Sequence, residues 1–213
     1  MMIAVDENGK EYIAIESQKQ DLLICPACCE PVILKTGKQK IAHFAHQSRK
    51  NCLGFSEGET SEHLQLKTTL FEWCRTWLKD VTVQLEENLP SLNQRPDILC
   101  GNLAIEIQCS MLSYKSVQER TKGYLMNGYR VWWILGSSFF RKDSLRSSDK
   151  YFCMYNEERG VHVWKLDLDQ KKCYLFHHIK ESVMGVLTFE QMSWAFFSHM
   201  LVDLLEVNLE KMK

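Results

Sequence analysis

Residues 94–110 of the chain, QRPDILCGNLAIEIQCS, decide the expected fold. They predict a β-hairpin in which residues 95–100 form the first strand, residues 103–109 form the second, and Gly101 and Asn102 make the turn. A Gly-Asn pair between two apolar runs suits the positive φ values of a tight hairpin turn. The β-branched and apolar residues on both sides of this turn are typical of a buried sheet.

Three polar side chains interrupt the apolar hairpin, namely Asp97, Glu106 and Gln108. Glu106 and Gln108 are two residues apart in one strand, so they point to the same face, and Asp97 lies across the hairpin. Two carboxylates that converge in a buried sheet repel each other, which favours a divalent metal ion between them. The alternative is that these are ordinary polar residues on a solvent-exposed face. The spacing of Pro-Asp and Glu-x-Gln resembles the core of the PD-(D/E)xK nuclease superfamily, with Gln108 where lysine is usual.

Composition places the chain among ordinary globular proteins, with 213 residues, 45% of them apolar and 25% charged. The formal net charge of −1 gives no overall attraction to nucleic acid, so a contact with DNA requires a local basic patch. We expect no membrane insertion, because no apolar run approaches the roughly 18 residues of a spanning helix and no signal peptide is apparent. The nine cysteines are therefore expected in a reducing cytoplasm, where clustered cysteines indicate metal binding.

A candidate zinc module lies near the N-terminus, in the sequence CPACCEPVILKTGKQKIAHFAH. Its expected ligands are Cys25, Cys28, His43 and His46, which a hairpin over the intervening residues would bring together. Two thiolates and two imidazoles make a tetrahedral zinc set, and four protein ligands make a structural site. The His-x2-His spacing is tighter than the usual one, so the spare thiolates of Cys29 and Cys52 are alternative ligands for one histidine position. The interpretation without metal is that the histidines are turn residues beside packed cysteines.

The remaining elements predict a mixed sheet flanked by helices, that is, an α/β sandwich. A helix is expected from about residue 60 to 79, and Glu62 and His63 near its start have helix capping as an alternative role. Further strands are expected at residues 81–85, 129–135, 151–155, 161–168 and 173–179. A polar helix is expected at residues 113–127, and an amphipathic helix from residue 188 to the end.

Several motifs in this order resemble the competence protein CoiA-like family: CPAC with HFAH, SEH followed by Lys67, PDILC with LAIEIQCS, QERTKGY, and GYRVWWILG. The resemblance implies a restriction-endonuclease-like α+β fold with a small zinc-binding module and a C-terminal hairpin and helix. It divides the chain into residues 1–53 (zinc-finger-like module), 54–140 (PD-(D/E)xK nuclease-like domain) and 141–213 (C-terminal strands and helix).

The same resemblance implies roles for single residues. Asp97 and Glu106 would bind catalytic Mg²⁺ or Mn²⁺, Gln108 would occupy the lysine position, and Glu62 would be the acid of the first helix with His63 beside it. Gln118, Arg120 and Tyr124 would lie on the following helix and face the site or the phosphates. Apart from the resemblance, Lys67, Lys115 and Lys122 are further residues expected to contact DNA.

The expected function is metal-dependent hydrolysis of DNA phosphodiester bonds in natural transformation, on single-stranded or branched DNA and in company with recombination proteins. Gln108 can form hydrogen bonds but carries no charge, so His63, Lys67 or Lys122 would have to supply the missing positive charge. One alternative is a non-catalytic accessory protein that uses a nuclease-like scaffold to bind DNA. Another is a small zinc-stabilised domain whose acidic hairpin is only polar surface.

Overall fold

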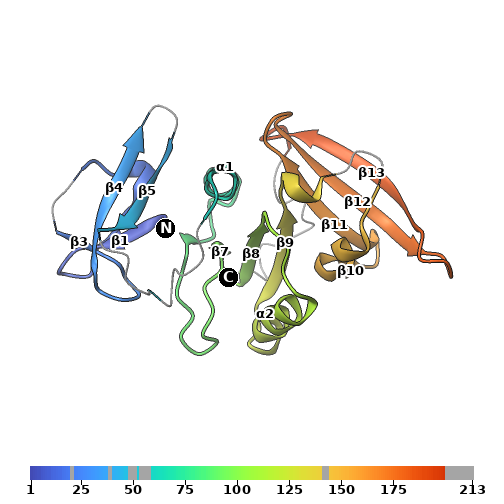
Figure 1. The fold of residues 1–213 in the computed structure, drawn as a ribbon, viewed down its shortest axis with the longest axis horizontal. Helices are drawn as coiled ribbons and strands as arrows, with labels where there is room; N and C mark the ends of the chain where they lie inside the picture. The colour runs from blue at the N-terminus through green and yellow to red at the C-terminus, as the bar shows by residue number, and fades with distance from the viewer. Residues whose placement is uncertain (20–21, 38–39, 48–51, 53–58, 141–143, 200–213) are drawn as a thin grey trace.

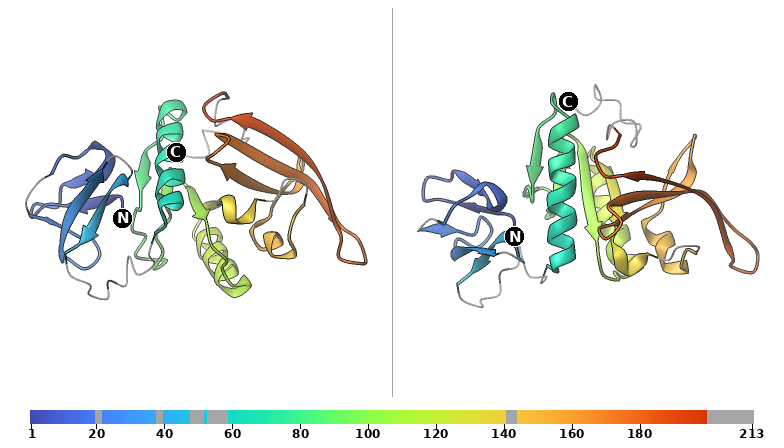
Figure 2. Two further views of the ribbon diagram at one scale, coloured as in Figure 1. Left: turned by 45° about the horizontal axis from the view of Figure 1, so that its top comes forward. Right: turned by 90° about the horizontal axis from the view of Figure 1, so that it is seen from above.

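The computed structural model describes residues 1–19, 22–37, 40–47, 52, 59–140 and 144–199. Two β-sheets lie on opposite sides of one long helix, α1, which spans Ser61–Trp77 (Figures 1 and 2). The smaller sheet is formed by the N-terminal residues and the larger sheet by the rest of the chain. The expected α+β fold with a β-rich N-terminal region is therefore confirmed.

The smaller sheet has the strand order β2-β1-β3-β4-β5, and all of its neighbouring strands are antiparallel. Its strands are β1 (Ile3–Val5), β2 (Glu11–Ile13), β3 (Leu23–Ile24), β4 (Pro31–Gly37) and β5 (Lys40–His46), with the 3-10 helix η1 (Ala14–Glu16) after β2. The β4–β5 hairpin is the one that the zinc motif predicts. Strand β5 lies at the edge of the sheet, next to the start of α1.

Helix α1 begins where the sequence predicts, because Thr60 caps its first turn. The Thr60 hydroxyl accepts a hydrogen bond from the His63 main-chain N–H at 3.1 Å. The apolar stripe of the helix, which includes Leu66, Leu70 and Trp73, is buried. This packing fixes the rotation of α1 and so determines which polar side chains of its first two turns reach the larger sheet.

The larger sheet has the strand order β13-β12-β11-β9-β8-β7-β6. Its first four strands along the chain are β6 (Val83–Leu85), β7 (Ile98–Cys100), β8 (Leu103–Gln108) and β9 (Arg130–Leu135). The β7–β8 hairpin pairs Ile98 with Ile105, and its turn residue Gly101 has φ of 55°, as the Gly-Asn pair predicts. Helix α2 (Tyr114–Met126) connects β8 to β9, which run parallel. These elements place the predicted acidic hairpin inside the sheet, between the edge strand β6 and β9.

The C-terminal strands extend this same sheet, because β11 pairs with β9 in parallel. They are β10 (Met154–Asn156), β11 (Gly160–Asp167), β12 (Lys172–Glu181) and β13 (Leu187–Ala195), and two 3-10 helices precede them, η3 (Ser137–Phe139) and η4 (Ser147–Phe152). The helix predicted from residue 188 is wrong for residues 188–199, because residues 188–195 pair with β12 as a strand and residues 196–199 form a turn and a bend. The rest of that predicted helix, from residue 200 onward, lies outside the described residues. The strand predicted at residues 151–155 is replaced by the end of η4 and the start of β10.

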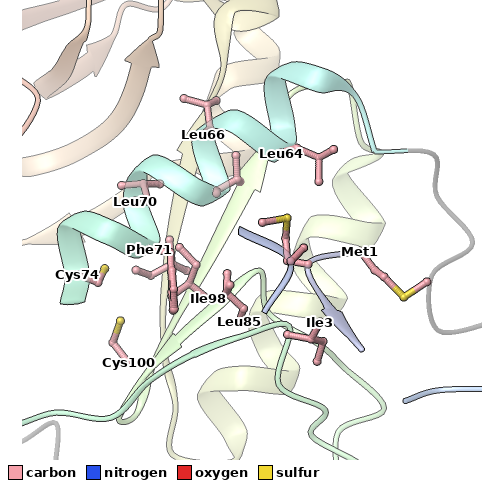
Figure 3. Packing of buried hydrophobic residues seen from close by; sticks show 14 of the residues in the cluster. Met1, Ile3, Leu64, Leu66, Leu70, Phe71, Cys74, Leu85, Ile98 and Cys100 are labelled. Atoms are coloured by element: carbon pink, nitrogen blue, oxygen red, sulfur yellow. The ribbon is translucent and has the colours of Figure 1, made fainter. Parts of the chain in front are cut away.

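One apolar cluster continues from the smaller sheet through α1 into the larger sheet (Figure 3). Met1 and Ile3 from the first residues, Leu64 from α1, and Leu85 and Ile98 from the larger sheet all belong to it. The two sheets therefore share a core, and the helix between them contributes side chains to both. No helix in the described part of the chain combines the length and the apolar character that crossing a membrane requires.

Candidate functional site

Asp97 lies at the centre of a network of charged side chains between β7 and α1. Its Oδ1 is 2.9 Å from Lys67 Nζ and its Oδ2 is 3.1 Å from His63 Nε2. Its Oδ2 also accepts a hydrogen bond from the Ile107 main-chain N–H at 2.8 Å, so the neighbouring strand holds the carboxylate in place. Burial raises the pKa of Asp97, but Lys67 and His63 lower it more, and it remains well below its usual range. Asp97 is therefore a carboxylate with fixed cationic partners.

Lys67 is the buried cation of this network. Its Nζ contacts carboxylate oxygens of Glu59, of Glu86 at 2.8 Å and of Asp97 at 2.9 Å. Burial lowers the pKa of Lys67, but the three carboxylates hold it well above its usual value. Glu86 also accepts a hydrogen bond from the Met2 main-chain N–H at 2.8 Å. The N-terminal residues thus contact the same network that Asp97 belongs to.

His63 bridges two of these carboxylates. Its Nδ1 is 3.2 Å from Glu59 Oε1, and its Nε2 is 3.1 Å from Asp97 Oδ2. Burial lowers the pKa of His63, but Asp97 and Glu59 outweigh burial and raise it to about 9. With a neutral His63, three carboxylates would face two cationic groups, the ammonium of Lys67 and the N-terminal ammonium of Met1, which lies 2.8 Å from Glu59 Oε2. A proton on His63 reduces this excess of negative charge.

Glu106 has a separate set of partners on α2. Both of its carboxylate oxygens accept hydrogen bonds from Arg120 Nη2, at 2.7 and 2.8 Å, and Tyr124 donates its hydroxyl to Oε1 at 2.5 Å. Arg120 and Tyr124 are four residues apart, so they share one face of the helix. Burial raises the pKa of Glu106 to about 7, although Arg120 opposes that rise. The sequence predicts that Asp97 and Glu106 share a metal, but in the structure each has its own cationic partners.

Gln108 and Glu62 bind main-chain groups near the end of β9. Gln108 Nε2 donates to the Ser110 carbonyl oxygen at 2.5 Å and contacts the Ser110 hydroxyl at 3.2 Å. Glu62 Oε1 accepts a hydrogen bond from the Ser137 main-chain N–H, and a side chain at Gly136 would approach this oxygen to 2.6 Å. Glu62 thus joins the start of α1 to the chain after β9 rather than joining the Asp97 network.

The structure separates the predicted DNA-contacting residues into buried and exposed ones. Lys67 and Tyr124 are fully buried, so neither side chain is accessible to DNA. Arg120 is committed to Glu106. The residues on the outer face of α2 are Lys115 and Lys122, which are exposed, and Gln118, which is partly buried. The expected contacts with DNA are thus reduced to a few side chains on one helix.

A divalent metal ion fits one part of this site and not the other. Ligand atoms of Glu59, His63 and Asp97 lie within 4.8 Å of one another, and carboxylates with an imidazole are ligands that Mn²⁺ accepts, as Mg²⁺ accepts the carboxylates. Metal binding through His63 would require loss of the ring proton, because a protonated imidazole has no lone pair for a metal. Glu106 does not fit as a ligand in this arrangement, because it is buried and hydrogen bonds occupy both of its oxygens.

The N-terminal module brings together four zinc-type ligands, Cys25, Cys28, His46 and Cys52. Cys25 Sγ lies 3.8 Å from Cys52 Sγ, and Cys28 Sγ lies 3.2 Å from His46 Nε2. A zinc–sulfur bond of about 2.3 Å in a tetrahedron separates two sulfur ligands by about 3.8 Å, so the thiol spacing suits zinc. The Ala27 main-chain N–H also points to Cys25 Sγ at 3.4 Å. The described part of the module thus contains a complete set of four ligand groups.

His43, which the sequence predicts as a ligand, is not part of this set. The reason is the period of a β-strand: His43 and His46 are three residues apart in β5, so they point to opposite faces. His43 Nδ1 instead lies 2.8 Å from the Ile41 carbonyl oxygen. Cys52 takes the fourth position, as one of the two spare thiols that the sequence offers.

Two acidic residues of the Asp97 network are missing from the predicted site. Glu59 could have been found, because Glu59, His63 and Lys67 follow one another at intervals of four residues, which is the spacing of one helix face. Glu86 follows β6 with φ of 50°, and no pattern around it indicates a buried carboxylate. Its place in the network depends on tertiary packing alone.

Comparison with known proteins gives matches along most of the chain. The family model described as "Competence protein CoiA, N-terminal domain" matches residues 6–55, and that described as "Competence protein CoiA, nuclease-like domain" matches residues 59–207. The chain is 34% identical over 128 residues to the "Competence protein CoiA" of Bacillus subtilis (strain 168). This alignment covers 58% of the chain and 34% of the relative, so the chain spans about a third of that relative's length. No solved structure matches the chain.

Proposed function

Because the chain belongs to the CoiA family of competence proteins, we propose that it processes DNA during natural transformation by hydrolysing phosphodiester bonds with a divalent metal ion. The proposed substrates are single-stranded or branched DNA, and recombination proteins are the proposed partners. A nuclease-like domain that matches residues 59–207 supports this proposal, since those residues include the whole Asp97 network.

The contact between Lys67 and Asp97 carries the proposal. Nucleases with this hairpin use a lysine two residues after the second acid, and Gln108 occupies that position here. Lys67 Nζ reaches Asp97 Oδ1 at 2.9 Å from a different element, the helix α1. A positive charge therefore lies beside the same carboxylate, where the buried Lys67 keeps Asp97 ionised without reaching the DNA itself, and this placement supports a role of the network in metal binding.

Each group in the site has a distinct proposed task. Asp97 and Glu59, with His63, would hold Mg²⁺ or Mn²⁺, which supplies an activated water and offsets charge on the phosphate when bound. The ammonium of Lys67 keeps the neighbouring carboxylates ionised and close together. The Ile107 main-chain N–H holds Asp97 Oδ2 against β8. Glu62 keeps the start of α1 attached to the chain after β9.

The second candidate function is binding of DNA without cleavage. The observation that favours it is Glu106, whose two oxygens are occupied by Arg120 and Tyr124 in a buried position. If both acids of the hairpin must bind metal for hydrolysis, this arrangement would prevent it. The nuclease-like fold would then serve as a scaffold for DNA and partner proteins.

A cleavage assay separates the two functions. Labelled single-stranded and branched DNA is incubated with the protein and Mg²⁺ or Mn²⁺, alongside the variants Asp97→Ala, Lys67→Met and Glu106→Gln. Asp80→Ala, which removes an exposed acid outside the network, is the matched control. We expect cleavage by the wild type and the control, and its loss in Asp97→Ala and Lys67→Met. Folding of each variant is checked by circular dichroism.

The other outcomes are equally informative. Cleavage that survives in Asp97→Ala would place the chemistry elsewhere. DNA binding without any cleavage by the wild type would contradict hydrolysis and favour the scaffold function. Glu106→Gln distinguishes the two roles of that residue, because full activity in this variant would show that Glu106 supports the fold and does not bind the metal.

For the N-terminal module, we propose a structural zinc site formed by Cys25, Cys28, His46 and Cys52. The four groups would close the coordination of the metal, so no position would remain for a substrate. The proposal follows from the ligand types and their mutual distances.

A further inference from the structure

A cavity of about 420 Å³ lies between the edge strand β5 and the first turn of α1. Its walls come from both parts of the molecule. Lys35, Lys40 and His43 belong to the β4–β5 hairpin, Ser61 begins α1, and Glu59 lies just before the helix. The cavity is thus formed where the N-terminal module meets the nuclease-like domain. Glu59 of the proposed hydrolysis site and His46 of the proposed zinc site each contribute one side chain to its lining, and the other lining residues belong to neither site.

One wall of the cavity is basic. Lys35 and His43 are cross-strand partners, so they occupy adjacent positions on the β4–β5 hairpin, and Lys40 begins β5. The lysine side chains are exposed and His43 is partly buried. The acid described on the opposite wall is Glu59, whose charge is already balanced by contacts with Lys67 and His63. An anion entering the cavity therefore meets an excess of positive charge.

Two hydrogen-bonding features add to this charge. The carbonyl oxygen of Ile41 can only accept, so His43 carries a proton on Nδ1, and a second proton on Nε2 would let the ring also donate to an anion. The first turn of α1, where Ser61 lines the cavity, presents main-chain N–H groups that no carbonyl of the helix can accept. The basic wall and the helix start thus favour the same kind of ligand, an anion with several acceptor oxygens.

One side chain, Glu59, belongs both to the wall of the cavity and to the proposed hydrolysis site. Glu59 lines the cavity and contacts His63, and His63 contacts Asp97. Two side chains, Glu59 and His63, would separate a phosphate group in the cavity from the carboxylate of Asp97, on which the proposed chemistry depends. The cavity volume is in the range of pockets for small ligands, which suits one or two nucleotides of a single strand and is too small for a duplex.

From these observations we propose that the cavity between β5 and α1 binds the sugar–phosphate backbone of single-stranded DNA and delivers it to Asp97. Lys35, Lys40 and His43 are its DNA-binding residues. The proposal rests on the proposed function in DNA processing, and it assigns DNA contact to the N-terminal module rather than to α2 alone.

The test measures binding without cleavage, by the fluorescence anisotropy of labelled oligo-dT in buffer with EDTA at several salt concentrations. The test variant is Lys35→Ala/Lys40→Ala. The control, Lys10→Ala/Lys19→Ala, removes the same charge from the same module away from the cavity. We expect binding to weaken by about tenfold or more in the test variant, and its salt slope to fall by about 1.4, because two phosphate contacts are lost from a single strand. His43→Ala should also weaken binding.

Photo-crosslinking of single-stranded DNA that contains halogenated deoxyuridine shows independently which residues of the protein lie next to the DNA. We expect the crosslinked peptide to contain Lys35, residues 40–46 or residues 59–64, where the lining of the cavity lies, rather than residues 114–126 of α2. Crosslinking to α2 alone would overturn the proposal.

The remaining outcomes keep this proposal distinct from the proposed function. Equal binding by the test variant and the wild type would overturn the cavity as a DNA site and leave hydrolysis open to its own assay. An equal loss of DNA affinity in the test and control variants would mean that only the net charge of the module matters. That result would also overturn the cavity as a DNA site. Stronger binding to duplex than to oligo-dT would contradict the size argument. Loss of binding in the test variant, together with no cleavage by the wild type, would support the cavity and contradict hydrolysis.

Discussion

His63 contributes to stability in a way that depends on pH. Burial lowers its pKa, but contacts with Asp97 and Glu59 raise it to about 9 in the folded protein. Because this value exceeds the unfolded value of about 6.5, the stabilisation is complete below pH 6.5 and is lost as pH rises through about 9. In EDTA, we expect the free energy of unfolding in urea to fall over this window, by up to about 3 kcal/mol, and to stay flatter in His63→Gln.

Asp97→Asn tests the cause of that pH dependence. It removes the carboxylate that contacts His63 Nε2 and keeps the shape of the side chain. This variant should flatten the profile in the same direction as His63→Gln. A wild-type profile that is already flat between pH 6.5 and 9 would show that His63 is not the titrating group.

The zinc ligands can be separated from their neighbours one residue at a time. Cys52→Ser and His46→Ala each remove one of the four clustered groups, so we expect loss of stoichiometric zinc. Cys29→Ser and His43→Ala change the same residue types outside the cluster and should retain it. Zinc is measured per protein chain by mass spectrometry after dialysis. Zinc loss in His43→Ala with retention in Cys52→Ser would restore the ligand set expected from the sequence.

For single residues, the sequence identifies which side chains belong to a site better than it identifies which side chains they contact. The thiols of Cys25 and Cys28 and the carboxylate of Asp97 could be identified from local spacing. The choice between His43 and Cys52 depends on which face of β5 meets the knuckle, which spacing alone leaves open. Glu106 and Arg120 belong to different elements, so their pairing depends on how α2 packs against β8.

The element β11 carries a buried ion pair that connects it to the 3-10 helices before it. Lys165 Nζ contacts Asp149 Oδ2 at 2.7 Å and donates to the Phe139 carbonyl oxygen at 2.7 Å. Both side chains of the ion pair are essentially inaccessible to solvent. This contact fixes η3 and η4 against the strand.

Breaking that pair should destabilise the protein strongly. Lys165→Met leaves the Asp149 carboxylate buried without its cation, which costs about 3–5 kcal/mol. The double variant Lys165→Met/Asp149→Asn removes both charges and should recover part of the loss. Urea denaturation of both variants provides the measurement. A single variant as stable as the wild type would show that the pair contributes nothing.

Predictions from the sequence are most accurate for elements whose pattern and neighbours agree. The β7–β8 hairpin follows from its turn residues and apolar strands, and α1 follows from its cap and apolar stripe. Residues 188–195 have apolar side chains at intervals that suit a helix, yet they form β13, because pairing with the long strand β12 satisfies their main-chain groups. A pattern within one segment does not reveal that a partner strand precedes it.

Across the whole molecule, the continuous apolar cluster predicts that both sheets unfold together. All six tryptophans lie in residues 73–194, so tryptophan fluorescence reports on α1 and the larger sheet and not on the smaller sheet. We expect removal of zinc by a chelator to lower the thermal midpoint seen by fluorescence, although the proposed zinc site is in the smaller sheet. The thermal transition seen by far-ultraviolet circular dichroism should have the same midpoint as the transition seen by fluorescence. An unchanged fluorescence midpoint would mean that the two parts unfold independently.

His46 is shared by two sites. The first site is the cluster of four zinc-type ligands, and the second is the cavity beside α1. If zinc fills the first place and a nucleotide the second, their binding free energies are linked, because any ligand that fixes this part of β5 changes the affinity of the other. Thermodynamic reciprocity makes the effect equal in both directions. The protein would then hold its zinc more or less tightly according to whether DNA is bound, and its affinity for DNA would respond to the supply of zinc in the cell.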